Sequence, residues 1–251
     1  MKKIIILLLV ACALLLAYRL LWKQDQPKQC CGNACKSRVE CTLDSALANP
    51  FSAGECQFTL GLNTDNAQIE TLGDTLVMTA GEQTDFFLSP QDSSIVATSP
   101  IILTAVDNTK PFTFTAKVTP EFTPDGTYAA GTLYAYERGD HWQKLAFEQS
   151  EDGLHRIVTV RTKGLSDDNN HQIETIPAVY LRISSDTRAI GSYYSEDGQT
   201  WHMARLCQND YPEQILLGLS AQSPKVGQHR CTFTEVEIKQ QPVADFREGK
   251  L

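Results

Sequence analysis

The sequence has no excess of positive charge. Its 22 lysine and arginine residues stand against 30 aspartate and glutamate residues, which gives a net charge of −8 at pH 7. A protein that binds nucleic acid through the phosphate backbone needs a basic surface. The sequence also contains no motif of a DNA- or RNA-reading fold. We therefore expect no nucleic-acid partner.

Motifs of the common catalytic sites are missing as well. There is no G-x-S-x-G, no H-E-x-x-H and no cysteine–histidine pattern of a thiol nucleophile. The cysteines do not form the paired C-x-x-C knuckles of a zinc site. Residues 167–170, Asp-Asp-Asn-Asn, offer oxygen ligands of the kind that calcium prefers, but we favour an ordinary polar loop there. The sequence predicts no catalytic residue, no metal site and no cofactor.

An apolar run at residues 4–22 follows two lysines near the N-terminus. About 20 such residues cross a bilayer as a helix. No small-residue cleavage site follows the run, so we predict an uncleaved signal anchor. A lipoprotein, because Leu-Val-Ala-Cys at residues 9–12 fits a lipobox, and an ordinary cleaved signal peptide are the alternatives. All three place the rest of the chain outside the cytoplasm, on the periplasmic or cell-surface side.

The chain contains eight cysteines. Membrane targeting with this many cysteines favours an oxidising compartment and disulfides. Metal or redox chemistry and unpaired thiols are the alternatives. With Cys12 in the apolar run, at least one of the others lacks an internal partner. Strand periodicity turns Cys207 and Cys231 inward, so we predict a bridge between them, which requires their Cα atoms to lie within about 7 Å.

From residue 58 onward, apolar and polar residues alternate with a period of two, which is typical of β-strands. Turn signals separate the strands, and Asp197-Gly198 is expected to close a hairpin anchored by Trp201. The expected strands cover residues 72–79, 101–103, 112–118, 131–137, 141–148, 156–163, 178–184, 189–195, 215–221 and 231–238. Many short strands without a helix predict an all-β jelly-roll sandwich of two antiparallel sheets.

The expected organisation has four segments. A signal anchor or signal peptide (1–23) leads into a Cys-rich tether (24–57), the sandwich (58–240) and a C-terminal tail (241–251). The tether is polar and contains prolines and glycines that break regular structure.

Short motifs within the sandwich segment resemble, in order, the domains of unknown function numbered 1349, a regulator-of-enolase-like family. The motifs include Thr84-Asp85-Phe86-Phe87, Trp142-x-Lys144-x-x-x-Glu148, Tyr194-Ser195-Glu196-Asp197-Gly198-x-x-Trp201 and Gly218-Leu219-x-Ala221-x-Ser223-Pro224. The resemblance implies a concanavalin A-like lectin/glucanase sandwich, similar to the C-terminal sandwich of some β-xylosidases, and no established reaction. One departure is that many relatives have Ser-Asp-Trp where this chain has Ser166-Asp167-Asp168.

Strand parity gives an independent route to a site. The residues expected to face the core are Leu133, Ala135, Leu145, Phe147, Val158, Val160, Val179, Leu181 and Ile183. Their neighbours then face the other way, and they combine rings for stacking with groups for hydrogen bonding, as a sugar requires. The predicted ligand-binding residues are Trp142, Lys144, Glu148, Arg161, Tyr134, Tyr136 and Arg182. A solvated face held by cross-strand pairs is the alternative.

We expect Glu148 to be ionised, because Lys144 and Arg161 beside it would lower its carboxyl pKa. Glu235-x-Glu237 places two carboxylates on one face, but the third acid of the sandwich glucanases is missing. The predicted function is therefore a membrane-tethered extracytoplasmic module that binds a glycan or polyol without cleaving it. A glycan-active hydrolase or lyase and a structural scaffold of the cell envelope are the alternatives.

Overall fold

The computed structural model describes residues 46–251. The expected anchor at residues 4–22, the lipobox at residues 9–12 and the cysteines before residue 46 lie outside these residues. Within the described part, no helix is long and apolar enough to cross a membrane. The helical structure of residues 46–251 is limited to one 3-10 turn, η1 (Thr64–Asn66). The described chain is therefore all-β, as predicted.

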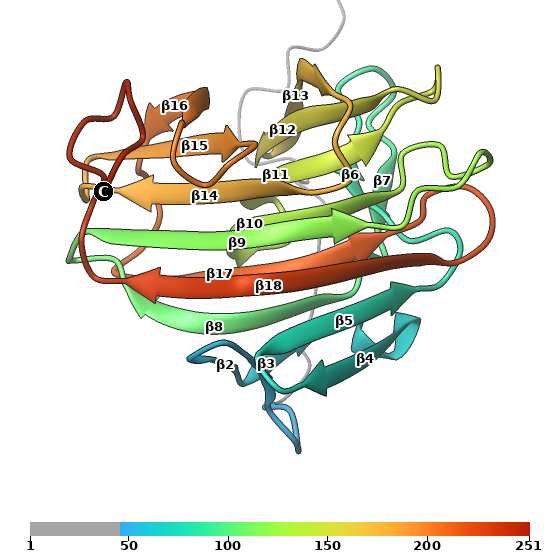
Figure 1. Cartoon of the computed structure of the whole chain (residues 1–251), viewed down its shortest axis with the longest axis horizontal. Coiled ribbons are helices and arrows are strands. Elements are labelled where there is room, and N and C mark those ends of the chain that lie inside the picture. The colour runs from blue at the N-terminus through green and yellow to red at the C-terminus, as the bar shows by residue number, and fades with distance from the viewer. Residues whose placement is uncertain (1–45) are drawn as a thin grey trace, which may run out of the picture. The chain divides into compact units, whose positions relative to one another are not determined.

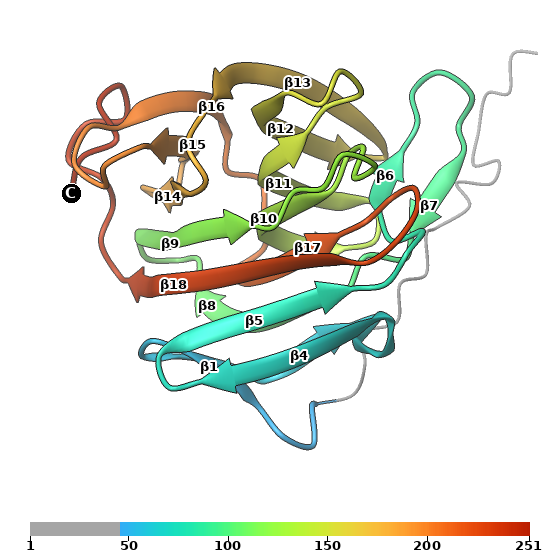
Figure 2. The same cartoon turned by 45° about the vertical axis from the view of Figure 1, so that its right-hand side comes forward.

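Two seven-stranded antiparallel sheets form the sandwich (Figures 1 and 2). Sheet 1 contains, in spatial order, β13 (Leu165–Glu174), β12 (His155–Lys163), β11 (His141–Gln149), β10 (Ala130–Arg138), β17 (Gln214–Gln222), β8 (Ile101–Asp107) and β3 (Leu60–Leu62). Sheet 2 contains β16 (His202–Gln208), β15 (Ala189–Ser195), β14 (Val179–Ser185), β9 (Phe112–Pro120), β18 (His229–Lys239), β5 (Thr75–Ala80) and β4 (Ala67–Leu72). Two hairpins complete the fold: β1 (Phe51–Ala53) with β2 (Cys56–Phe58), and β6 (Phe86–Leu88) with β7 (Ile95–Ala97).

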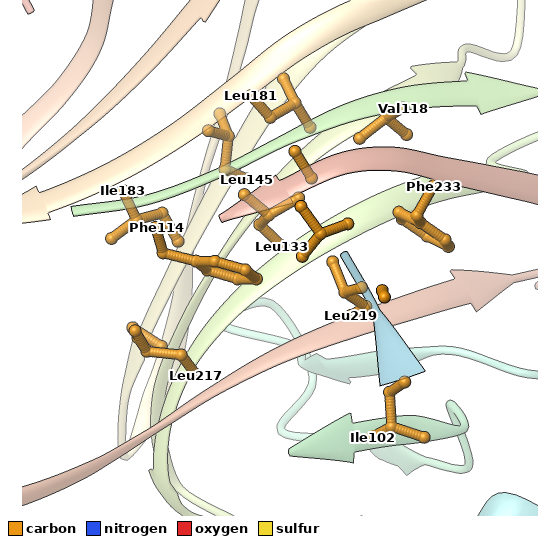
Figure 3. Packing of buried hydrophobic residues seen from close by; sticks show 14 of the residues in the cluster. Ile102, Phe114, Val118, Leu133, Leu145, Leu181, Ile183, Leu217, Leu219 and Phe233 are labelled. Carbon is orange, nitrogen blue, oxygen red and sulfur yellow. The ribbon is translucent and has the colours of Figure 1, made fainter. Parts of the chain in front are cut away.

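The main core lies between the two sheets (Figure 3). Leu133 and Leu145 of sheet 1 belong to the same fully buried cluster as Phe114, Val118 and Leu181 of sheet 2. Burying one such side chain contributes about 1.5–3 kcal/mol. The core positions predicted on β10, β11 and β14 are confirmed.

The outer face of sheet 1 is covered as well. The segment from residue 84 to residue 99 lays the β6–β7 hairpin over it, so that Phe86 and Leu88 pack into an outer cluster with Trp142. The rings of Phe86 and Trp142 stack with their centroids 4.8 Å apart. Sheet 1 is thus buried on both faces in this region.

Burial of both faces of sheet 1 explains an error in the prediction of which β12 side chains face the main core. Val158 and Val160 belong to the outer cluster, whereas the prediction placed them in the main core. Lys144 pairs with Val160, and Gln143 pairs with Arg161. Since paired residues share a face, Arg161 points to the opposite side of the sheet from Lys144. When both faces of a strand are buried, hydrophobicity does not reveal which side chains face the main core.

Residues 167–170 do not form the expected loop. They lie in β13, an edge strand of sheet 1 that pairs with β12. The turn comes earlier, at Gly164, whose φ of 85° favours glycine. Residues 167–170 are exposed to solvent on this edge, so no apolar alternation marks the strand.

The predicted bridge between Cys207 and Cys231 is wrong. Both thiols are free. Cys231 belongs to the main core and Cys207 packs against it, as parity suggested. However, three strands of sheet 2 separate β16 from β18. At about 4.8 Å per strand, four steps place the two cysteines about 19 Å apart, far beyond the reach of a disulfide.

The hairpin expected at Asp197-Gly198 joins β15 to β16. Trp201 is buried at its end, but on the outer face of sheet 2, where it forms a small cluster with Tyr193 and Val243. Val243 comes from the segment after β18. Residues beyond 240 therefore contribute to the packed structure.

The outer cluster predicts a large loss of stability for Trp142→Ala. The ring is 0% exposed and its Nε1 donates to the carbonyl oxygen of Gly139 at 3.1 Å. Truncating a buried tryptophan costs about 3–5 kcal/mol. Urea denaturation followed by fluorescence or circular dichroism measures the change. Leu72→Ala, at a residue that is 57% exposed, is the control, with an expected change of at most about 0.5 kcal/mol. Equal stability of the two variants would contradict the packing described.

Candidate functional site

Two of the predicted site residues, Lys144 and Glu148, line a cavity of about 370 Å³ on the outer face of sheet 1. Both project from β11, four residues apart and therefore on one face. Three predicted aromatic residues lie in the adjoining outer cluster and are 0% exposed: Tyr134, Tyr136 and Trp142. Parity placed them on the correct face, but the expectation that this face is open was wrong, because residues 84–99 cover it.

Arg161 and Arg182 lie elsewhere. Arg161 Nη2 donates to Asp210 Oδ1 at 2.6 Å, and Lys163 Nζ donates to Asp210 Oδ2 at 2.7 Å. Burial alone would raise the pKa of Asp210, but hydrogen bonds from Lys163 and Arg161 hold it well below its usual range. Arg161 is thus the partner of a structural carboxylate on the other face of sheet 1. Arg182 belongs to sheet 2 and lines a separate cavity.

The cavity beside β11, which we call the Lys144–Glu148 cavity, has further lining groups that are not among the predicted ligand-binding residues. They include Asp85, Phe87, Tyr128, Asp168, Asn170 and Gln222. Asp85 and Phe87 belong to a motif of the family resemblance. Asp168 stands where that resemblance expects a tryptophan. Asn170 belongs to the polar stretch at residues 167–170, whereas Tyr128 and Gln222 carried no sequence signal, because only the strand order brings them here.

Lys144 is a buried cation with a complete set of partners. It is 3% exposed. Its Nζ donates to Asp85 Oδ1 at 3.2 Å, to the Phe86 carbonyl oxygen at 3.1 Å and to Gln222 Oε1 at 3.0 Å. An ammonium group has three donors, so none remains for a ligand. Although burial opposes its charge, Asp85 raises the pKa of Lys144 above the ordinary value.

Glu148 differs from Lys144 because no hydrogen bond reaches its carboxyl group from residues 46–251 in the structure. Burial raises the pKa of Glu148 to about 8, and Asp85 and Asp168 reinforce the shift against the opposing effect of Lys144. Partial desolvation of its carboxyl group beside the cavity also raises the pKa of Asp168, although the residue as a whole is exposed on the edge strand. The expectation of an ionised Glu148 was wrong, because Asp85 already balances Lys144 and Arg161 lies across the sheet. A protonated Glu148 can donate a hydrogen bond as well as accept one.

The rings of Phe87 and Tyr128 add apolar surface to this cavity. The Tyr128 backbone adopts a left-handed φ of 64°, and its carbonyl oxygen accepts a hydrogen bond from Gln222 Nε2 at 3.0 Å. A cavity of this volume lies in the range of small-molecule sites, about 300–1,000 Å³. Within residues 46–251, no group of three His, Cys, Asp or Glu side chains is arranged to hold a metal ion.

The raised pKa of Glu148 predicts a pH-dependent contribution to the free energy of unfolding. The folded protein holds this proton more tightly than the unfolded chain, where the ordinary pKa is about 4.5. The stabilisation is therefore complete below pH 4.5 and is lost as the pH rises through about 8. Glu148→Gln should become progressively more stable relative to wild type across this window. Urea denaturation at several pH values measures the difference, with Glu70→Gln on exposed β4 measured alongside to account for removal of one charge. A difference that stays constant from pH 4 to pH 9 would contradict the shift.

Comparison with solved structures places the fold among known sandwiches. A functionally unknown protein from Saccharomyces cerevisiae aligns with a TM-score of 0.64 and 19% identity, over 70% of this chain and 97% of that chain. The GH43 protein BlXynB from Bacillus licheniformis aligns with a TM-score of 0.50 and 12% identity, over 68% of this chain and 37% of that chain. An engineered GH43 glycoside hydrolase aligns with a TM-score of 0.52 and 13% identity, over 85% and 43% of the respective chains. The protein thus spans less than half of these two GH43 chains, and such low identities show the fold alone.

Comparison with curated proteins gave no match. A family model, described as "Protein of unknown function (DUF1349)", matches residues 62–241. The match covers most of the sandwich. The chain belongs to the DUF1349 family.

Proposed function

We propose that the protein binds a carbohydrate or similar polyol in the Lys144–Glu148 cavity and does not cleave it. The observation that carries this proposal is the juxtaposition, in one cavity, of aromatic surface with carboxyl and amide groups that have room for new hydrogen bonds. Phe87 and Tyr128 offer rings against which the C–H face of a sugar can stack. Glu148, Asp168 and Asn170 offer partners for its hydroxyl groups.

The protonation of Glu148 suits a neutral ligand of this kind. A sugar hydroxyl is both a donor and an acceptor, and a protonated carboxyl group has the same two capacities. A ligand without hydroxyls would leave the Glu148 carboxyl group unpaired, at a cost of about 1–3 kcal/mol. The cavity should therefore select for hydroxyl-bearing ligands by penalising the others.

The names of the structural neighbours agree with this chemistry without deciding it. Two of the similar chains are GH43 proteins, and one is named a glycoside hydrolase with endo-xylanase and exo-arabinofuranosidase activity. Because this protein spans less than half of those chains, their activity as whole proteins does not transfer. The chemistry of the cavity is the stronger support for a carbohydrate ligand.

A glycan-active hydrolase or lyase is the second candidate, favoured by one observation. A carboxyl group with a pKa of about 8 is protonated at neutral pH, as a general acid must be. The partner in such a mechanism is a carboxylate that stays ionised. Of the other carboxylates that line the cavity, Asp85 is committed to Lys144, and Asp168 and Glu151 lie at exposed positions. Binding without cleavage therefore fits the cavity better than hydrolysis.

A glycan array probed with the full-length protein tests the proposed ligand class. Wild type should bind glycans on the array, and Glu148→Ala and Phe87→Ala should each weaken the binding by about 1–3 kcal/mol, the scale of losing one anchor of a small interface. Arg188→Ala, in an 88% exposed side chain on another part of the surface, is the control. The proposal fails if wild type binds no glycan or if both cavity variants bind like wild type. Release of reducing sugar by wild type, abolished in Glu148→Gln, would favour the hydrolase instead.

We also propose that residues 4–22 hold this module at the outer side of a membrane as an uncleaved helix. The unbroken apolar length of this run, about that of a bilayer-spanning helix, is the support for the proposal. The full-length protein should stay in the membrane fraction after alkaline carbonate extraction, with its N-terminal segment intact by mass spectrometry. A mature protein that begins at a lipid-modified Cys12 would contradict the anchor and establish the lipoprotein alternative.

A further inference from the structure

A second and larger cavity, of about 820 Å³, is lined by β14 and β18 of sheet 2, by β8 of sheet 1 and by the β1–β2 hairpin. Arg182 and Tyr180 project into it from β14, Trp201 from the end of the β15–β16 turn, and Glu235 and Glu237 from β18. It shares no lining residue with the Lys144–Glu148 cavity. The two cavities can therefore be tested separately.

Arg182 is held rigidly at the wall of this cavity. Its side chain is buried, at 6% exposure. The guanidinium group lies 3.6 Å from the centroid of the Trp201 ring. Nε donates to Thr115 Oγ1 at 3.0 Å, and Nη1 donates to the carbonyl oxygen of Gly249 at 2.6 Å. These contacts fix the plane of the group and leave it little conformational freedom to lose on binding.

The charge of Arg182 is nevertheless without a counter-ion. No carboxylate of residues 46–251 forms an ion pair with it, and both of its hydrogen bonds go to neutral oxygens. A guanidinium has five N–H donors, so these two bonds leave Nη2 unused. Burial lowers the pKa of Arg182 to about 10, with Glu237 opposing the shift. Buried charges are ordinarily paired, because an unpaired one is costly.

The carboxylates of the same cavity have partners of their own. Lys239 Nζ lies 2.7 Å from Glu237 Oε1. Glu235 accepts a hydrogen bond from the Tyr180 hydroxyl at 2.9 Å and lies 3.9 Å from Lys117 Nζ. These pairs leave carboxylate oxygens with spare capacity to accept hydroxyl protons. Four acidic side chains against two basic ones also line the cavity, which opposes a ligand with several negative charges.

From this arrangement we propose that the cavity binds a sugar acid, with its single carboxylate on Arg182 and its hydroxyl groups on the glutamates of β18. A carboxylate supplies the missing counter-charge and matches the planar donor fork of a guanidinium. The hydroxyls satisfy the acceptors that would repel a second anionic group. The volume lies within the range of small-molecule sites, about 300–1,000 Å³. This site is independent of the function proposed for the Lys144–Glu148 cavity.

Isothermal titration of the full-length protein with three probes tests the proposal. Methyl glucuronide carries the carboxylate and the hydroxyls, methyl glucoside lacks the carboxylate, and acetate lacks the sugar. Wild type should bind methyl glucuronide at least tenfold more tightly than either of the other two. Arg182→Gln should abolish the preference, and Arg182→Lys, which keeps the charge but not the planar fork, should lose most of it. Arg188→Ala, in an 88% exposed side chain outside both cavities, should leave the preference unchanged.

Several results would overturn the proposal. They are no binding of methyl glucuronide, equal affinity for methyl glucoside, equal affinity for acetate, or a tenfold preference that survives in Arg182→Gln. If Arg182→Gln fails to fold, the proposal is tested by the affinities of wild type for the three probes and by the loss of the preference in Arg182→Lys. Loss of the preference in Arg188→Ala as well would show that the preference does not depend on this cavity, and would refute the site.

Discussion

The outer face of sheet 1 depends on the buried ammonium group of Lys144. An ion of this size costs several kcal/mol to bury unless protein groups replace its hydration. Two of its three acceptors come from Asp85 and Phe86, so satisfying the charge requires the segment from residue 84 to residue 99 to lie on the sheet. That placement stacks Phe86 on Trp142 and closes the outer cluster. The same interaction therefore shapes the wall of the neighbouring cavity.

Complete pairing of Lys144 determines the chemistry beside it. Because Asp85 matches the lysine charge, Glu148 has no free cation nearby, and burial favours its protonated form. Arg182 on sheet 2 presents the opposite situation, with a buried positive charge and only neutral oxygens as partners. The two proposals above thus assign a neutral polyol to one face of the sandwich and a ligand with a single negative charge to the other.

The period of two in the sequence was enough to predict the class of fold and most core positions, including Leu133, Leu145 and Leu181. It failed at Val158 and Val160, because β12 lies in a sheet with apolar surroundings on both faces. It also failed for β13, because this exposed edge strand shows no alternation of apolar and polar residues. The pairing of Cys207 with Cys231 failed because parity fixes the face of a residue but not the order of strands. Lys144 and Glu148 were found because they share one strand, whereas Asp168 and Gln222 reach the cavity only through tertiary pairing.

A carbon-13 NMR titration of the Glu148 side-chain carboxyl group tests the central claim most directly. The claim is that sheet 1 holds a protonated acid in a ligand-binding cavity, next to a lysine whose charge is already satisfied. The account predicts a midpoint near pH 8 in the free protein and a change of that resonance when a glycan selected from the array is added. A midpoint near pH 4.5, the ordinary value, with no response to any glycan, would contradict it.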